Sequence, residues 1–355
     1  MRIRVVVGFM TLLPAWGCFG AHPTSGGDDT VSTAPDSMGG AGSAAMQPDF
    51  HNPTPLPDRG PLVPRYDLPD MPIGLVPPAA GAGKGEIVTE FASDANDEWL
   101  TLLEVDWELG ARAEDHLCAR VRVPRAMYLH EFVPISPLGT HHTQLAVHDA
   151  GSGQAGVTSC GPDGAGHHIF GAGVASEPLT LPDGIAMRIE EGQELLLNLH
   201  LFNVGDETLT GRSGVRVRTM AEADVENLAE IVLAGPIGLI IPPGRVTQSG
   251  QCTFGGDATI FNLGPHMHQL GVHLRAVAQT QAGEVMLYDD GYDFDSQQRH
   301  PVDFVQMHAG DVVHVECTYQ NDTDRSVGWG QSSLDEMCFA SMMRFPPLGG
   351  YLCSN

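Results

Sequence analysis

The chain is poor in positive charge and has almost no lysine. Its 355 residues include 18 basic and 44 acidic side chains, giving a formal net charge of -26, and Lys84 is the one lysine. A surface of this kind repels phosphate backbones, and no basic stripe interrupts it, so we expect no nucleic-acid partner. The negative charge favours solubility and, more weakly, a preference for cationic substrates.

Several catalytic signatures are also absent. The sequence has no G-x-S-x-G elbow, no phosphate-binding P-loop, no H-E-x-x-H and no G-x-G-x-x-G that opens a helix. These absences remove the sequence support for the hydrolases, nucleotide-binding proteins and metalloproteases that use those motifs. No C-x-x-C pair occurs either, which argues against cysteine-bound zinc and against covalently attached haem.

The amino-terminal residues predict export. A short basic start is followed by the apolar run V-V-V-G-F-M-T-L-L-P-A-W, so we assign residues 1–18 to a signal peptide too short to span a membrane. Gly17 before Cys18 favours a lipidated cysteine that would anchor the chain to a membrane, whereas Ala15 and Trp16 favour plain secretion. We therefore expect a secreted, periplasmic or outer-membrane lipoprotein location.

The rest of the sequence divides by composition. Residues 19–85 are rich in Gly, Ala, Pro, Ser and Asp and predict a disordered linker. Beyond them, short alternating or apolar runs recur between Gly, Pro and Asp turns, and one stretch near residue 225 is briefly helical in pattern. We predict an all-β fold of two jelly-roll-like antiparallel β-sandwich domains in tandem, over residues 86–232 and 233–355.

Besides Cys18, six cysteines remain, and an even set in an exported chain predicts three disulfides. Six cysteines allow 15 pairings, and spacing alone does not choose among them.

Histidines supply the candidate metal sites. His266 and His268 form an H-x-H pair whose side chains share one face of a strand and can bind one ion. His141 and His142 are adjacent, so both can reach one ion at a bend or through different ring nitrogens. His200, on an apolar strand, is the candidate third ligand; a lone histidine there is more often a core residue.

Other histidines have weaker claims. The adjacent pair His167-His168 lies beside glycines but has no third ligand by pattern, and we expect it not to bind metal. We expect the same of His116, His130, His148, His300, His308 and His314. His273 has the wrong strand parity to join His268. Met337 is one of 14 methionines, most of which fill cores.

In order and in spacing, these motifs resemble the copper type II, ascorbate-dependent monooxygenases. The resemblance covers roughly residues 86–353 and rests on H-H-T-Q-L, L-N-L-H, H-M-H-Q-L-G, Y-D-F-D-S-Q-Q and the run from H-A-G-D-V-V-H-V-E-C to S-S-L-D-E-M-C. It implies one copper held by His141, His142 and His200, and a second, oxygen-binding copper held by His266, His268 and Met337. A thioether ligand suits copper, especially Cu(I).

The resemblance further implies the disulfides Cys118–Cys160, Cys252–Cys353 and Cys317–Cys338. It implies that ascorbate or another one-electron donor supplies electrons, that O2 is the co-substrate, and that a C–H bond of a small organic molecule is hydroxylated. The two coppers are expected to face each other across a solvent-filled cleft in a monomer.

Two departures concern the substrate. The peptide-amidating enzyme has an arginine two residues before the H-x-H pair, where this chain has Gly264. The family as a whole tends to have a tyrosine four residues after the methionine, where this chain has Ser341. We therefore predict that peptide amidation is not the activity.

Two other functions compete with the monooxygenase. An exported copper-binding protein without turnover would not need two different ligand sets. A zinc hydrolase would leave Met337 unexplained.

Overall fold

The computed structural model describes residues 85–91, 99–160, 166–173, 176–330, 332 and 334–354. The predicted signal peptide with Cys18, and all but the last residue of the predicted linker, lie outside these residues. The described ranges contain β-strands and one short 3-10 helix at Glu222–Asp224. The all-β fold predicted from the sequence is therefore confirmed. Within those ranges no helix is long and apolar enough to cross a membrane.

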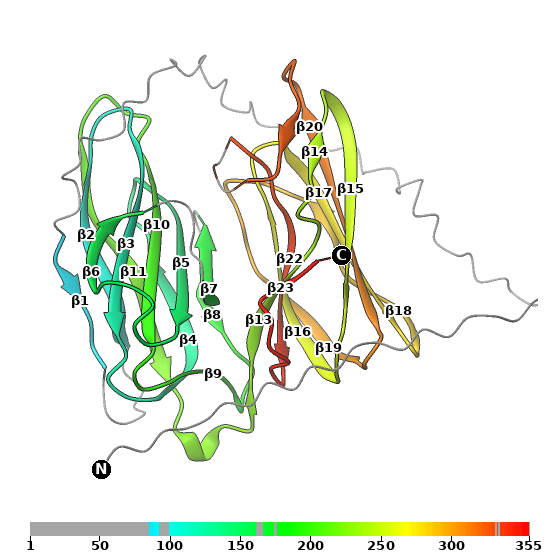
Figure 1. Cartoon of the computed structure of the whole chain (residues 1–355), viewed down its shortest axis with the longest axis horizontal. Coiled ribbons are helices and arrows are strands. Elements are labelled where there is room, and N and C mark those ends of the chain that lie inside the picture. Colours follow the sequence, from blue (N-terminus) through cyan, green and yellow to red (C-terminus); the bar gives the residue numbers. More distant parts are fainter. Residues whose placement is uncertain are drawn as a thin grey trace, which may run out of the picture. The chain divides into compact units, whose positions relative to one another are not determined.

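The first half of the described chain forms twelve strands. They are β1 (Ile87–Val88), β2 (Leu100–Leu109), β3 (Glu114–Arg122), β4 (Met127–Ile135), β5 (Thr140–His148), β6 (Gly156–Ser159), β7 (His167–Gly173), β8 (Leu179–Thr180), β9 (Ile185–Ile189), β10 (Glu194–Phe202), β11 (Leu209–Thr219) and β12 (Asn227–Leu228). One sheet has the order β1-β2-β11-β4-β9-β12, with β8 beside β4, and the other has the order β6-β3-β10-β5-β7. Figure 1 labels the strands of both sheets. Buried apolar residues from the two sheets form one shared hydrophobic core.

Strand β10 shows why this half packs as a sandwich. Its sequence E-L-L-L-N-L-H-L-F places leucines at alternate positions, and successive side chains of a strand point to opposite faces. Four of these leucines are at most 2% exposed and belong to the core: Leu195, Leu197, Leu199 and Leu201. Burying one such side chain contributes about 1.5–3 kcal/mol. Asn198 and His200 therefore lie on the opposite face of the sheet.

The second half forms the remaining strands. They are β13 (Glu230–Ala234), β14 (Ile240–Ile241), β15 (Gly244–Thr253), β16 (Ala258–Met267), β17 (Gly271–Thr280), β18 (Gly283–Gly291), β19 (His300–Met307), β20 (Val312–Asn321), β21 (Val327–Gly328), β22 (Cys338–Phe345) and β23 (Leu352–Cys353). The sheets have the orders β19-β16-β22-β13-β23 and β15-β20-β17-β18, and β14 pairs with β21. A second hydrophobic core lies between the two larger sheets.

The strands change partners between Leu228 and Glu230. Strand β12 runs parallel to β9 in the first half, whereas β13 pairs with β22 and β23 in the second. The boundary predicted between residues 232 and 233 falls inside β13, and the division into two domains stays a prediction.

Apolar contacts join the two halves. The core of the first half also contains Ile231, Phe261 and Met343, which lie on β13, β16 and β22. These strands are neighbours in one sheet of the second half. One face of that sheet therefore packs against the first half while the other faces the second core.

Three disulfides crosslink the described strands. The pairs are Cys118–Cys160, Cys252–Cys353 and Cys317–Cys338, as the resemblance implies. Each closes a loop, of 42, 101 and 21 residues respectively. A disulfide contributes about 2–4 kcal/mol, chiefly by restricting the unfolded chain.

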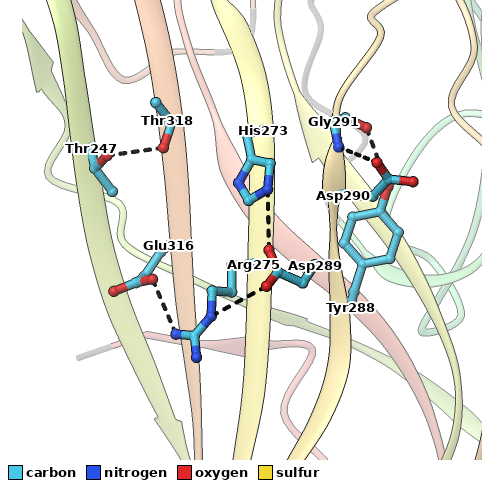
Figure 2. A network of polar contacts seen from close by, with 9 residues as sticks. All are labelled: Thr247, His273, Arg275, Tyr288, Asp289, Asp290, Gly291, Glu316 and Thr318. Carbon is cyan, nitrogen blue, oxygen red and sulfur yellow. Dashed lines mark hydrogen bonds and ion pairs between the residues drawn. The ribbon is translucent and has the colours of Figure 1, made fainter. Parts of the chain in front are cut away.

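A polar network covers part of the β15-β20-β17-β18 sheet (Figure 2). Arg275 on β17 lies between two acids, 3.3 Å from Glu316 and 3.7 Å from Asp289. The second oxygen of Asp289 is 3.1 Å from Nε2 of His273. His273, which the sequence analysis left out of the metal sets, therefore has a carboxylate partner of its own.

Candidate metal centres

The first predicted histidine set lies on neighbouring strands of one sheet. His142 on β5 pairs with His200 on the central strand β10, and His200 pairs on its other side with His116 on β3. Directly paired residues have their side chains on the same face of a sheet. The three rings therefore form a row across three strands, on the face opposite the leucine core. His116, which we expected not to bind metal, is part of this row.

A β-bulge brings His141 into the same group. The register between β5 and β10 shifts by one residue between His200 and Leu201, so His141 is the extra residue on β5. Gly139 just before it has a φ of 100°, which a glycine adopts without strain. The bend expected ahead of the adjacent histidines is therefore present. It places Nδ1 of His141 3.3 Å from Nδ1 of His142.

The four rings lie close together. The ring centroid of His200 is 4.4 Å from that of His116, 4.7 Å from that of His142 and 5.0 Å from that of His141. One nitrogen each from His116, His142 and His200 lies within 4.8 Å of the other two. This is a spacing at which side chains can share an ion. The structure thus brings together the three predicted residues and adds a fourth imidazole.

Glu114 determines which nitrogen His200 presents. Its Oε1 lies 2.6 Å from Nε2 of His200, and a carboxylate oxygen accepts a hydrogen bond, so Nε2 carries the proton. Nδ1 of His200 is buried without a hydrogen-bond partner and keeps its lone pair. A carboxylate behind a histidine ligand orients the ring and increases its basicity.

Burial lowers the pKa of the three histidines around His200. Burial and then the charge of His200 lower the pKa of His116 and of His141 to about 4. The same causes, in the same order, lower the pKa of His142 well below its usual value. Since the neutral imidazole is the form that binds metal, these three histidines can bind an ion at neutral pH without losing protons.

The second set presents the other ring nitrogen. His266 lies on β16 and His268 follows one residue after that strand ends. Their Nδ1 atoms are 2.9 Å from Oε1 of Gln297 and 3.0 Å from the carbonyl oxygen of Asp335. Both partners are acceptors, so each Nδ1 is the donor and each Nε2 has a lone pair for a metal. Burial, then the charge of His266, lowers the pKa of His268 to about 3.

The segment that carries Met337 is attached to the second set through hydrogen bonds of neighbouring residues. The carboxylate of Glu336 is fully buried and accepts hydrogen bonds from the backbone N–H of His268, at 2.9 Å, and of Leu270, at 2.6 Å. The hydroxyl of Tyr319 donates to the carbonyl oxygen of Met337, at 2.7 Å. The segment with the predicted thioether ligand is therefore tied to the backbone of the H-x-H pair.

Residues from the second half also contact the first set. The ring of Phe294 lies 4.5 Å from that of His141 and 6.3 Å from that of His268. The carbonyl oxygen of Gln297, whose side chain binds His266, accepts a hydrogen bond from the hydroxyl of Ser176 at 3.1 Å. An aromatic side chain is therefore near both histidine sets, where the resemblance implies a solvent-filled cleft.

The adjacent pair His167-His168 has other partners. Nε2 of His167 is 3.7 Å from Glu230, and the ring of His168 stacks on Tyr351 with centroids 4.9 Å apart. Of the six single histidines set aside, four contact residues outside both sets: His130, His300, His308 and His314. Nε2 of His148 is buried without a partner, but His148 belongs to no candidate metal group of the described residues.

Arg299 lies beside Gly264 and Ser341, the two positions at which the sequence departs from the resemblance. Its Nη1 would lie 3.2 Å from a Cβ atom at Gly264. Its guanidinium donates to Oδ1 of Asn262, at 2.7 Å, and to the hydroxyl and carbonyl of Ser341, at 3.2 and 2.8 Å. The small residues Gly264 and Ser341 thus leave space for an arginine that comes from another part of the chain. Burial lowers its pKa to about 10.

Both sets fit copper. Both offer several imidazoles, of which His200, His266 and His268 have one ring nitrogen bonded to an oxygen acceptor, and the second set adds a thioether on an adjoining segment. Imidazole suits several transition metals, while a thioether selects for Cu(I). Glu114, His116, Gln297 and Glu336 were not predicted as site residues; for Glu336 the neighbouring Met337 was the available signal.

Comparisons with known proteins agree with the resemblance. Residues 227–355 match the family model described as copper type II ascorbate-dependent monooxygenase, C-terminal domain. "DBH-like monooxygenase protein 1" from Mus musculus is 27% identical over 213 residues, covering 53% of this chain and 34% of that protein. The protein of the same name from Homo sapiens is 24% identical over 212 residues, with the same coverage.

The aligned region thus spans about a third of the length of these curated relatives. A solved structure titled "Structure of infectious bursal disease virus Gx strain" aligns with a TM-score of 0.17 and 9% identity, over 76% of this chain and 72% of that one. A likeness so slight has no bearing on the fold.

Proposed function

We propose that the chain is a copper-dependent monooxygenase, because residues 227–355 match the model of the C-terminal domain of the copper type II ascorbate-dependent monooxygenases and two DBH-like monooxygenase proteins are similar to part of the chain. In this proposal it hydroxylates a C–H bond of a small organic substrate, with O2 as oxidant and ascorbate or another one-electron donor as reductant. His141, His142 and His200 would hold one copper, and His266, His268 and Met337 would hold the other.

The observation that supports this proposal is the difference between the two histidine sets. The first has Nδ1 of His200 available behind a carboxylate, and the second has Nε2 of His266 and His268 available behind neutral oxygen acceptors. A protein that merely stores copper needs no such difference. Two ions in unlike environments suit a reaction in which one site supplies an electron to the other.

The overall reaction balances with two electrons. The substrate C–H and O2, with two electrons and two protons, give the C–OH product and one water. When bound, copper would supply the one-electron redox chemistry that protein side chains lack. The chain's own residues hold the imidazoles in place, bond one ring nitrogen of His200, His266 and His268 through Glu114, Gln297 and Asp335, and place Phe294 beside His141 and His268.

We further propose that the substrate is not a glycine-extended peptide. The guanidinium of Arg299 lies against Gly264, so a large side chain at position 264 does not fit without displacing it. Arg299 is also bonded to Ser341, the second position at which the chain departs from the family pattern. Conversion of such a peptide at a useful rate would show this part of the proposal to be wrong.

Export and a monomeric state complete the proposal. The three disulfides fit an oxidising compartment. Secretion, or periplasmic or outer-membrane lipoprotein placement with a lipidated Cys18, is the proposed location.

Copper content tests the proposal first. We would measure copper by elemental analysis in wild-type protein, Met337→Ala and His141→Ala. The expected result is two coppers per chain in the wild type, with one site lost or greatly weakened in each variant. Zinc in place of copper, or full copper in both variants, would contradict the ligand sets.

Oxygen consumption separates the enzyme from a copper-binding protein without turnover. With ascorbate present, oxygen uptake should rise when a substrate is added and should match the hydroxylated product one to one. Copper at both sites, with no substrate-dependent uptake across a broad panel of small molecules, would favour the binding protein.

A further inference from the structure

The histidines at the first centre include one imidazole, that of His116, beyond the three proposed copper ligands. His116 faces His200 directly across the β3–β10 pair, and its ring centroid is 4.4 Å from that of His200. A nitrogen of His116 lies within 4.8 Å of nitrogens of both His142 and His200. No pattern within the sequence distinguishes this histidine from the others that were set aside.

The ring of His116 has no competing partner. Its Nε2 is buried, and within the described residues the ring forms no hydrogen bond. A buried polar atom left without a partner costs about 1–3 kcal/mol, so such atoms in native structures usually have a ligand, a water or a functional role. The metal that the neighbouring histidines are proposed to bind would give Nε2 of His116 a partner.

We propose that His116 is a further nitrogen ligand of the copper held by His141, His142 and His200, making this a four-histidine site. The inference rests on the proposed function, because it takes copper at this site as given. It adds a ligand on β3 to those on β5 and β10, so that three adjacent strands contribute to one ion.

Ligation requires the His116 ring to turn. Its plane is within 3° of that of His200, and a metal lies in the ring plane of each imidazole that binds it, so two stacked parallel rings cannot share one ion. The torsion between Cβ and the ring has broad minima, and no hydrogen bond of the ring has to break. The other ring of the stacked pair, that of His200, stays fixed by its hydrogen bond to Glu114.

A fourth imidazole has a defined redox consequence. Cu(II) favours tetragonal sites with four nitrogen or oxygen donors, whereas Cu(I) is satisfied by fewer ligands. His116 would therefore stabilise the oxidised ion more than the reduced one. Removing it should weaken Cu(II) binding, affect Cu(I) binding much less, and raise the reduction potential of this site.

His116→Phe separates ligation from stacking. Phenylalanine keeps an aromatic ring against His200 but has no nitrogen, so a role in packing alone would survive the change. We would place it in a His266→Ala/His268→Ala background, where the second site is disabled and the copper signal comes from the first. Imidazoles around Cu(II) would be counted by X-ray absorption and by electron paramagnetic resonance, with Cu(II) affinity measured by chelator competition.

The matched control is His148→Phe. His148 also lies in the first half and also has a buried Nε2 without a partner, but it is outside the histidine group. Near-ultraviolet circular dichroism would confirm that both variants are folded. If His116→Phe does not fold, His116→Gln, which keeps a polar side chain, takes its place.

The expected result is one fewer imidazole in His116→Phe and a Cu(II) affinity at least about tenfold lower, the lower limit for losing even an outer partner of a metal ligand. The control should match the background protein. An unchanged imidazole count and affinity in His116→Phe would overturn the inference while leaving the three-histidine site intact. Absence of copper from the background protein itself would overturn the inference and the proposed first site together.

Discussion

The two candidate metal centres are held in different ways. The first has its histidines on three adjacent strands of one sheet, with a single bulge to align His141 and His142. The second takes a histidine from the end of β16, another just beyond it, and Met337 from the irregular segment before β22. The first centre is therefore a product of strand register, and the second depends on how a non-strand segment is attached.

The attachments differ in chemistry as well. Glu114 at the first centre binds a histidine ring, whereas Glu336 at the second binds backbone N–H groups and leaves the rings to Gln297 and Asp335. The carboxylate at the first centre therefore acts directly on a histidine ligand. The carboxylate at the second centre holds in place the segment that carries Met337. The same substitution at the two glutamates should therefore affect different centres, and stability to different extents.

Glu336→Gln is expected to have the larger effect. It replaces a fully buried carboxylate that accepts from the backbone of His268 and Leu270 by an amide that directs N–H groups at one of them. Hydrogen bonds to charged groups contribute about 1.5–3 kcal/mol each, so we expect a loss of about 3 kcal/mol in the free energy of unfolding. Copper at the second centre should fall with it, and copper at the first should remain.

Urea unfolding and copper content would be measured on the same preparations. Glu230→Gln is a suitable companion, because Glu230 is also buried and bonds Arg344 and a backbone N–H, yet lies outside the ligand sets. It should lower stability and leave both coppers in place. Equal copper loss in the two variants would mean that stability, and not attachment of Met337, explains the effect.

Glu114→Gln is expected to have a smaller effect on stability and a specific one on copper. The Glu114 side chain is 16% exposed, so water can replace part of what it loses. His200 would lose the carboxylate on its Nε2, and loss of such a partner costs roughly 10–100-fold in metal affinity. The first centre should therefore weaken while the second is unaffected. A weakened second centre would break the distinction between the two.

The sequence was a good guide wherever a site depends on residues close together in the chain. The H-x-H pair, the adjacent histidines with a glycine before them, and the alternating leucines of β10 are visible in short windows. The disulfide partners and Met337 came from the resemblance, since no spacing rule selects them.

It was a poor guide to contacts that depend on register between distant strands. His200 is 86 residues from Glu114, and their 2.6 Å contact arises because β3 pairs with β10 in one register. His116 is brought to His200 in the same way. Arg299 fills the space beside Gly264 for a related reason, because two small residues on neighbouring strands leave room for it. Local pattern does not record any of these choices.

Arg275→Met should have the smallest effect on copper and marks the limit of the comparison. Arg275 pairs with Glu316 and Asp289 on the β15-β20-β17-β18 sheet, which contributes no candidate ligand (Figure 2). The methionine keeps an apolar stem of similar length, but the Arg275 and Glu316 side chains are only 17% and 14% exposed, so we expect losing their pairing to lower the free energy of unfolding by about 1–3 kcal/mol. Both centres should keep their full copper. Loss of copper would show that this sheet helps to position the second centre, which would then depend on its whole sandwich and not on Glu336 alone.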